Sequence, residues 1–482
     1  LYAEGNTISH LDYEFASDGF TGDNASNTTI DNVAMFGTLS LAANGIYLSN
    51  STSMIFNNNA ISVGGDYGIY CDNSSNSIIQ NNNLSGSYSQ AAIRMNSCDS
   101  CDFSNNIITN GQPYHGIWVD NGSFLTINNN EIHDFAQYGI LFTNSENSTV
   151  NYNRVLSLNN GDWRTGIANY EGGQNAVVNY NYVEIRGDNG HHYGIEVNDS
   201  EVRGDTVIVH TDYYCCDRDA RSIKADRSII EDNYIINSVE SCHCGSTSAI
   251  ESWSDVSNRS SIKNNIIYAG GRVYGISASY ADIENNHIER LPNTGQHGFS
   301  IGHGNYNVIR NNTIVNMQSG IQANDSWDNV IESNTIDVFN DGISANNAYG
   351  RHTITDNYIT SSGSENLLHV TNTDSVIVRN NIFLSTGGGG VSFYDTYVEV
   401  RYNLLKTPGR GMHFENQIAG EIENNTIISD NLGDYGIHIS NLSAPVVQNN
   451  IVEGFANGIY AENDLQNQFI QNNNLWNISE DI

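Results

Sequence analysis

Lysine, proline and long apolar runs are scarce in this sequence of 482 residues. Lysine occurs only at positions 224, 263 and 406, and the 4 prolines leave backbone hydrogen-bond ladders almost uninterrupted. No run of about eighteen apolar residues is present, which excludes a membrane-spanning helix. No apolar stripe repeats at helical spacing, so helices are not expected.

Basic charge is also scarce. The chain has 19 Lys+Arg against 54 Asp+Glu, a net charge of −35, and charged residues make up only 15% of it. Such an acidic protein repels nucleic acid and anionic membrane surfaces, so neither is expected as a partner. A polyanionic substrate would need a local basic site. The composition fits an extracellular or cell-surface location.

A short motif recurs from one end of the chain to the other. It consists of Gly-Ile followed by an apolar residue and an Asn or Asp turn. The interval between copies is about 21 to 28 residues, which predicts a solenoid rather than separate globular domains. The glycines are expected where the backbone bends closely. The copies begin at Gly45, Gly68, Gly116, Gly139, Gly166, Gly194, Gly275, Gly320, Gly342, Gly436 and Gly458.

A second motif, Asn-Asn-x-Ile, recurs with the same period as the first. Examples begin at Asn129, Asn264, Asn285, Asn311 and Asn424. Each repeat thus holds three short β-branched runs separated by Asn, Asp and Gly. Asn tolerates the left-handed conformation and can turn the chain between strands. In stacked coils, we expect asparagine side chains to hydrogen-bond in a ladder and inward Ile and Val to stack likewise.

These repeats resemble the right-handed parallel β-helix proteins of the pectin-lyase-like class. The resemblance is to the Asn-rich branch, which includes periplasmic copper-site maturation proteins and many microbial surface proteins. It implies an all-β fold, a single right-handed parallel β-helix of about 18 coils over residues 1–482. The class contains polysaccharide lyases, glycoside hydrolases, tailspikes, adhesins and structural surface proteins, so it leaves activity open.

The 7 cysteines fall at positions 71, 98, 101, 215, 216, 242 and 244. Because residues one coil apart lie about 4.8 Å apart, we predict bridges between Cys71 and Cys98 and between Cys215 or Cys216 and Cys242 or Cys244. These bridges imply an oxidising compartment. Cys101 is left as a thiol for an intermolecular bond. The alternative for the second group is a metal site that includes His243.

The coils between Gly139 and Gly275 are longer than most, and insertions in solenoids often form the binding face. This segment gathers basic and acidic side chains. A β-elimination lyase needs a base and a cation that holds the sugar carboxylate, and we also consider Asp212 and Asp217 as calcium ligands. No other cofactor is expected. The catalytic candidates are His210, Asp212, Asp217, Arg221, Lys224 and Arg227; the alternative is that they form exposed ion pairs.

Asn-x-Ser/Thr sequons are frequent, as expected by chance in a chain rich in Asn, Ser and Thr. They permit glycosylation without supplying excess evidence for it. The candidates are Asn24, Asn27, Asn50, Asn73, Asn121, Asn147, Asn198, Asn258, Asn324, Asn441 and Asn477.

Three functions remain open. The first is an extracellular structural building block of a surface layer, sheath or fibre, because repeats occupy both ends of the sequence and exposed strand edges invite self-association. It is favoured because no catalytic constellation stands out. The second is a polysaccharide lyase or glycoside hydrolase, and the third is a glycan-binding adhesin or tailspike-like module.

Overall fold

A computed structural model shows a parallel β-solenoid of about 18 turns, which confirms the predicted fold class. It describes residues 5–15, 18–37, 44–109, 111–159, 163–170, 172–187, 190–211, 219–239, 247–271, 273–292, 299–302, 304–416, 418–441, 443–462 and 469–479. Over these ranges the chain contains strands and turns but no helix, and hence no helix that could cross a membrane. The chain divides into two compact units, residues 1–251 (unit 1) and 252–482 (unit 2). A single continuous domain stays a prediction.

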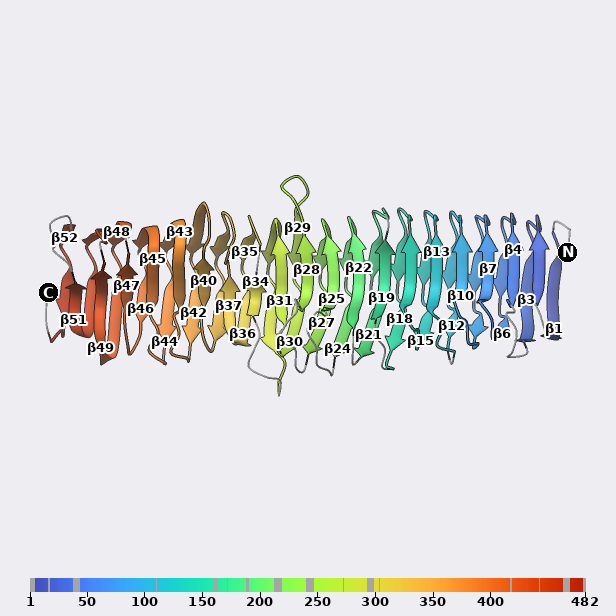
Figure 1. Ribbon diagram of the computed structural model, residues 1–482, viewed down its shortest axis with the longest axis horizontal. Coiled ribbons are helices and arrows are strands. Elements are labelled where there is room, and N and C mark those ends of the chain that lie inside the picture. Colours follow the sequence, from blue (N-terminus) through green and yellow to red (C-terminus); the bar gives the residue numbers. More distant parts are fainter. Residues whose placement is uncertain are drawn as a thin grey trace. The chain divides into compact units, whose positions relative to one another are not determined.

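Each turn contributes one strand to each of three parallel ladders. Unit 1 begins with β1 (Thr7–Phe15), which pairs with β3 (Thr29–Gly37). The turns of unit 1 follow one another in chain order, so each strand pairs with the strand one turn away (Figure 1). The first ladder, which carries the Gly-Ile dipeptides, consists of β2 (Phe20–Asp23), β4 (Ile46–Ser49), β7 (Tyr67–Asp72), β10 (Ala91–Asn96), β13 (His115–Asp120), β16 (Tyr138–Thr143), β19 (Trp163–Tyr170), β22 (His191–Asn198), β25 (Ala220–Asp226) and β28 (Ser248–Trp253).

The other two ladders of unit 1 have shorter strands. The second ladder follows β3 with β5 (Ile55–Asn57), β8 (Ile78–Gln80), β11 (Asp102–Ser104), β14 (Thr126–Asn128), β17 (Thr149–Asn151), β20 (Val177–Asn179), β23 (Glu201–Arg203) and β26 (Ile229–Glu231). The third has the end of β3, β6 (Ala60–Ser62), β9 (Asn83–Leu84), β12 (Ile107–Ile108), β15 (Glu131–His133), β18 (Arg154–Ser157), β21 (Tyr182–Gly187), β24 (Thr206–Thr211) and β27 (Tyr234–Val239).

Unit 2 repeats this plan, and four of its strands are long enough to enter two ladders. Its first ladder has β31 (Tyr274–Ser279), β34 (Phe299–Gly302), β37 (Ser319–Gln322), β40 (Ile343–Asn346), β43 (Leu368–Arg379), β45 (Val391–Arg401), β47 (Met412–Glu415), β49 (Thr426–Ser440) and β51 (Ile451–Ala461).

The second ladder of unit 2 has β29 (Ser260–Lys263), β32 (Ala281–Glu284), β35 (Val308–Arg310), β38 (Val330–Glu332), β41 (Arg351–Thr355), the ends of β43 and β45, β48 (Ala419–Glu423), β50 (Val446–Gln448) and β52 (Phe469–Gln471). The third has β30 (Ile266–Gly271), β33 (His287–Arg290), β36 (Thr313–Met317), β39 (Thr335–Val338), β42 (Tyr358–Ser361), β44 (Ile382–Ser385), β46 (Leu404–Lys406), the starts of β49 and β51, and β53 (Asn474–Trp476).

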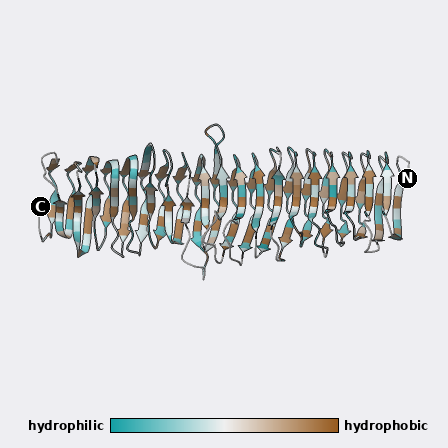
Figure 2. Ribbon diagram, viewed as in Figure 1, coloured by the Kyte–Doolittle hydropathy of each residue, from teal (hydrophilic) through white to brown (hydrophobic). Residues whose placement is uncertain are grey.

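The core of unit 1 consists of stacks of mostly apolar side chains, one of which is isoleucine throughout. Hydrophobic and hydrophilic residues alternate along the strands (Figure 2), so one set points inward. The isoleucine that follows each glycine is aligned with its counterpart one turn away and is fully buried, as predicted. A side chain on Gly194 would collide with Val207 and with the carbonyl oxygen of Ser222, which explains the glycine. The stack contains Ile46, Ile69, Ile93, Ile117, Ile140, Ile167, Ile195, Ile223 and Ile250.

The predicted asparagine ladder is present in both units. The first residue of each Asn-Asn pair adopts a left-handed conformation, for example Asn129 with φ of 55°. The second points inward, and its amide donates to the next amide oxygen along the stack at 2.9–3.0 Å. In unit 1 the stack contains Asn59, Asn82, Asn106, Asn130, Asn153, Asn181, Asp205 and Asn233; in unit 2 it contains Asn265, Asn286, Asn312, Asn334, Asn357, Asn381, Asn403, Asn425, Asn450 and Asn473.

Asp205 is the one acid among the stacked residues that the structure describes. Its Oδ1 accepts from the Asn181 amide at 2.9 Å, and its backbone N–H donates to Asn233 Oδ1 at 2.9 Å. The other carboxyl oxygen, Oδ2, replaces an amide donor; it is buried and has no hydrogen-bond partner. Burial raises the pKa of Asp205 well above its usual value, despite hydrogen bonds from Asn181.

The predicted bridge between Cys71 and Cys98 is wrong. Cys71 aligns with Met95 and is a free, buried thiol of the inward stack, because the local period is 24 residues (95 − 71) and Cys98 lies three residues beyond that position. Cys98 instead bonds Cys101 within one turn, with Cα atoms 6.3 Å apart, so Cys101 is not the leftover thiol. One turn earlier Ser74 and Ser77 hold the equivalent turn by a hydrogen bond. Cys215, Cys216, Cys242, His243 and Cys244 lie outside the described residues.

Candidate functional site

Two of the predicted catalytic residues, Arg221 and Lys224, lie on β25 and face outward from the first ladder. Ser222 occupies the position of the repeated glycine, and Ser222 and Ile223 are both buried, so Arg221 and Lys224 face the same side although they are three residues apart. Arg227 follows β25 at the corner, where it binds both carboxyl oxygens of Asp199 at 2.8 and 2.7 Å. His210 lies on the third ladder and contacts Ser238. Asp212 and Asp217 fall outside the described residues.

Lys224 is held by a carboxylate that sequence analysis missed. Glu196 on β22 is aligned with Lys224 one turn away, and its Oε1 lies 2.7 Å from Nζ. The Tyr170 hydroxyl donates to the other oxygen of Glu196. Burial, followed by the charge of Glu196, raises the pKa of Tyr170, so this hydroxyl keeps its proton. The carboxylate is thereby fixed on both oxygens, with its side chain only 8% exposed.

Arg221 is bound on three sides. Its Nε lies 2.6 Å from Glu251 Oε2, Nη2 lies 3.0 Å from Asp219 Oδ2, and Nη1 donates to the Tyr193 hydroxyl at 2.8 Å. Burial alone would lower the pKa of Arg221, but Glu251, Tyr193 and Asp219 outweigh it and raise the pKa. Burial also raises the pKa of Tyr193 to about 12. The Tyr193 hydroxyl, which accepts from Arg221, can therefore donate its own hydrogen to a ligand.

We refer to the residues Tyr170, Tyr193, Glu196, Asp219, Arg221, Lys224 and Glu251 as the ion-pair cluster. Aromatic rings border it: Trp163 at the start of β19 is 60% exposed and lies 4.4 Å from the His191 ring, centroid to centroid. Lys224 lies over the Tyr193 ring at 5.7 Å. The cluster therefore combines fixed hydrogen-bonding groups with an accessible aromatic face.

Tyrosine precedes the Gly-Ile dipeptide at positions 67, 138, 193, 274 and 435, and over the described ranges these tyrosines do not stack in a continuous ladder. The residue aligned with Tyr138 one turn later is Thr165, and the residue aligned with Thr165 in the next turn is Tyr193, so a threonine separates the two tyrosines. Tyr138 instead makes an edge contact with Tyr170 at 5.7 Å. These rings pack locally against neighbouring side chains.

The intervals between aligned residues lengthen in this part of unit 1. Ile117 and Ile140 are 23 residues apart (140 − 117), whereas Ile167 and Ile195 are 28 apart (195 − 167). Part of the increase lies in longer third-ladder strands, such as β24, with 6 residues against 3 in β15.

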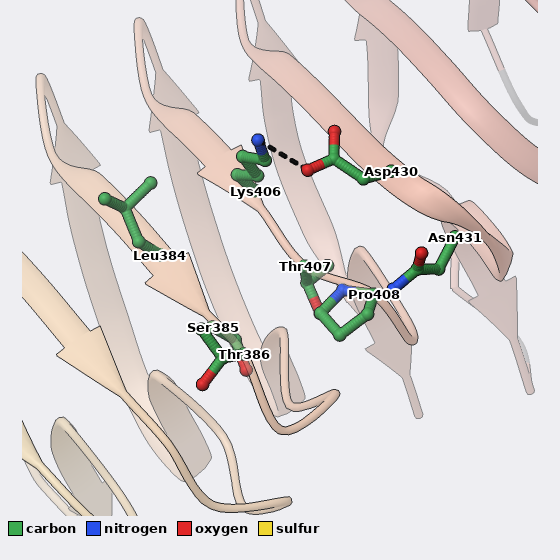
Figure 3. Close-up of a pocket in the computed structure, with 8 residues that line it drawn as sticks. All are labelled: Leu384, Ser385, Thr386, Lys406, Thr407, Pro408, Asp430 and Asn431. Carbon is green, nitrogen blue, oxygen red and sulfur yellow. Dashed lines mark ion pairs between the residues drawn. The ribbon is translucent and has the colours of Figure 1, made fainter.

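A hollow in unit 2, of about 370 Å³, offers a contrasting site (Figure 3). It lies where β44 and β46 end and beside Asp430 and Asn431 within β49, and its one ion pair joins Lys406 Nζ to Asp430 Oδ2 at 2.6 Å. Both side chains are about half exposed or more, at 48% and 63%. Its lining residues are Leu384, Ser385, Thr386, Lys406, Thr407, Pro408, Asp430 and Asn431.

Metal binding finds no support in the described part of the chain, where no group of three or more His, Cys, Asp or Glu is arranged to hold an ion. The calcium site on Asp212 and Asp217 and the metal site that includes His243 both involve residues outside it. They stay predictions.

Comparison with solved structures finds distant similarity. A tailspike protein variant of E. coli bacteriophage HK620, in complex with a pentasaccharide, is 12% identical with a TM-score of 0.37, over 72% of this chain and 69% of that one. The PL6 family alginate lyase AlyGC is 12% identical with a TM-score of 0.29, over 98% of each chain. A GH87 α-1,3-glucanase from Streptomyces thermodiastaticus is 11% identical with a TM-score of 0.26, over 81% of this chain and 63% of that one.

No curated protein matches the sequence. The family model described as a right-handed β-helix region matches residues 67–217, 216–383 and 297–475. These matches span most of the sequence. The chain therefore belongs to the right-handed β-helix family.

Proposed function

We propose that this chain is an extracellular glycan-binding β-helix protein that holds an uncharged oligosaccharide against the ion-pair cluster of unit 1. The observation that carries the proposal is the pairing of every cation in the cluster with a carboxylate of the same cluster: Lys224 with Glu196, and Arg221 with Glu251 and Asp219. The groups are fixed before a ligand arrives, which reduces the entropy lost on binding.

The chemistry of these groups matches a sugar ring. Carboxylates and a guanidinium form charge-assisted hydrogen bonds with hydroxyl groups, which are about twice as strong as neutral ones, and the phenol of Tyr193 adds a neutral hydrogen bond. Trp163, with its exposed ring, supplies an apolar face for the C–H side of a pyranose. A site with both features binds a polar ring without needing net charge on the ligand.

A uronate would be bound less well. Its carboxylate would have to take Lys224 or Arg221 from a partner, which leaves a buried carboxylate such as Glu196 uncompensated. Breaking a buried pair in this way costs several kcal/mol. The same argument weighs against β-elimination, which needs a cation for the sugar carboxylate. The alternative is a lyase, in which the binding of a uronate chain offsets the free energy lost on breaking the ion pair.

Binding and turnover can be tested together. Wild-type protein, a Trp163→Ala variant and a matched Trp327→Ala control are applied to paired neutral and uronate oligosaccharides. Trp327 lies in unit 2 and is 44% exposed. We expect neutral glycans to bind, Trp163→Ala to lose about tenfold or more in affinity, and Trp327→Ala to bind as wild type.

Product analysis for new reducing ends and unsaturated uronates distinguishes a binding protein from an enzyme. Binding without products supports the proposal, whereas unsaturated products would establish the lyase. Absence of any glycan binding by folded protein would contradict it.

Self-association into a surface layer, sheath or fibre is a separate proposal from the sequence. Sedimentation velocity at high concentration, with and without reductant, tests it, because reductant reports on intermolecular disulfides. Polymers that persist at dilution would support it, and a monomer under all conditions would remove it. Calcium on Asp212 and Asp217 is tested by comparing thermal unfolding before and after chelation.

A further inference from the structure

A second cluster of side chains lies outward on the first ladder of unit 2, far along the sequence from the ion-pair cluster. In successive turns the residue after the inward-pointing one is His369, Ser392, His413, His438 and Tyr460. We refer to His413, Glu415, Tyr435, His438, Tyr460 and Glu462 as the histidine cluster. Its residues come from β47, β49 and β51 and from the turn after β51.

The rings of this cluster form a stacked platform. His413 and His438 are stacked with centroids 4.7 Å apart and planes at 11°. Tyr435 stacks on His438 at 4.7 Å, and Tyr460 lies 5.0 Å from Tyr435 and 5.3 Å from His438. Tyr460 is 37% exposed, so its ring can be reached from solvent.

Two carboxylates flank these rings. Glu462 Oε1 lies 3.0 Å from His438 Nε2, and its side chain is 41% exposed. Glu415 Oε2 lies 3.6 Å from His413 Nε2 and its other oxygen accepts from the Asn441 amide at 2.9 Å. His438 itself is nine-tenths buried, and its Nδ1 has no hydrogen-bond partner in the described structure. The cluster thus keeps hydrogen-bonding capacity that its own residues do not use.

The arrangement is unsuited to nucleophilic catalysis. Ser440 Oγ and Glu415 both approach Nε2 of His413, at 3.4 and 3.6 Å. A relay needs the hydroxyl and the carboxylate on different ring nitrogens. The cluster is therefore considered as a binding site.

The local charge is negative when the imidazoles are neutral. Arg410 is the nearby cation, and Asp434 lies 4.0 Å from it, which leaves Glu415 and Glu462 without a permanent positive partner among the described residues of the cluster. Burial, and next the proximity of His438, lower the pKa of His413, so this ring is neutral at physiological pH. Tyr394 also faces Glu415, and their hydrogen bond raises the pKa of Tyr394 to about 12.

We propose that the histidine cluster is a binding site for an organic ammonium group, which sits on the Tyr460 and Tyr435 rings and is neutralised by Glu462. Stacked aromatic faces beside a carboxylate are the chemistry that recognises such cations. Acidification opposes binding, because protonation of His413, whose Nε2 faces Glu415, places a positive charge beside the ligand and neutralises that carboxylate. The site is thus occupied at neutral pH and released in acid.

Choline and its uncharged isostere 3,3-dimethylbutan-1-ol are suitable probes, because they share shape and differ in charge. Calorimetric titration of the full chain at about pH 7.5 and about pH 4 compares the two, because the pKa of His413 lies below that of an ordinary histidine. We expect choline to bind at the higher pH about tenfold more tightly than the alcohol and to lose about tenfold at the lower pH. Equal binding of the two probes, or no binding of choline by folded protein, would overturn the proposal.

Variants locate the site. Tyr460→Ala and Glu462→Gln are each expected to weaken choline binding about tenfold. Tyr402→Ala, which removes a 60% exposed tyrosine of unit 2 outside the cluster, should leave binding unchanged. Circular dichroism melting of each variant shows that it is folded. Unchanged choline binding by folded Tyr460→Ala and Glu462→Gln would also overturn the proposal, whatever unit 1 does with glycans.

Discussion

The outward faces of the two units use the same positions of the first ladder for different chemistry. In unit 1 the residues in register are Glu196, Lys224 and Glu251; the two carboxylates are buried, Lys224 is partly exposed, and all three are ion-paired. In unit 2 they include the stacked His413 and His438, and the charge of His413 depends on pH. The shared backbone therefore fixes where side chains lie, and residue choice decides whether a face is permanently charged or titratable.

The largest expected difference concerns loss of a carboxylate. Glu251→Leu leaves the guanidinium of Arg221, only 11% exposed, without its main partner. We expect the free energy of unfolding to fall by about 3 kcal/mol. Glu462→Leu in unit 2 removes a carboxylate whose side chain is 41% exposed. It should change the free energy of unfolding by less than about 0.5 kcal/mol. Chemical denaturation measures both, and equal losses would contradict the contrast.

A second difference lies in the asparagine stacks, because unit 1 contains Asp205 and the described stack of unit 2 contains only asparagine. The pKa of Asp205 is raised by burial, so its stabilising contribution is complete below the usual Asp pKa and is lost as pH rises. Asp205→Asn should therefore stabilise by about 2 kcal/mol near pH 8 and by much less near pH 4.

The reverse change in unit 2 is the matched control. Asn334→Asp places a carboxyl at the equivalent position, between Asn312 and Asn357. It should destabilise by about 2 kcal/mol near pH 8 and recover near pH 4. Denaturation of both variants across this range tests the sign, and a pH-independent effect would show that the carboxyl does not change its protonation.

A smaller effect is expected from one hydroxyl. Tyr170→Phe removes the donor to Glu196 and should lower the free energy of unfolding by about 1.5 kcal/mol. Tyr435→Phe in unit 2 keeps the ring that stacks on His438 and should be nearly neutral. Thermal unfolding followed by circular dichroism compares the two. Equal stability of the two variants would contradict this expectation, because both keep the ring and only Tyr170→Phe removes a hydrogen bond to Glu196.

The smallest effect concerns the hollow of unit 2. Lys406→Ala breaks an ion pair whose side chains are 48% and 63% exposed, so we expect less than about 0.5 kcal/mol. Lys224→Met, which removes the partner of the buried Glu196, should cost several times more. Denaturant midpoints of the two variants make the comparison. A larger loss for Lys406→Ala would identify the hollow as the more important site.

The repeats predict the fold because identical residues recur at identical positions. The Gly-Ile and Asn-Asn phrases locate the inward stacks, and Ile195 and Asn130 lie where the pattern places them. The cysteine pairing failed because a spacing of about one coil does not fix the register. Cys98 is three residues away from the position aligned with Cys71.

The site was only partly predictable. The clustered basic residues of the sequence indicated Arg221 and Lys224. They gave no indication of Glu196 and Glu251, because neither glutamate is directly next to another charged residue in the sequence. Aligning the repeats on the isoleucine shows Leu141, Ala168, Glu196, Lys224 and Glu251 at one outward position. That alignment carries the missing signal. Tyr170 and Trp163 depend on side-chain directions that the pattern does not specify.

The most direct test of the account is a quantitative comparison of matched neutral and uronate oligosaccharides binding to wild-type protein and to Trp163→Ala. The ion-paired state of Lys224 and Arg221 predicts preference for the neutral ligand and loss of its binding in the variant. Preference for the uronate, or unchanged binding by Trp163→Ala, would contradict the assignment of the ion-pair cluster as a site for uncharged glycans.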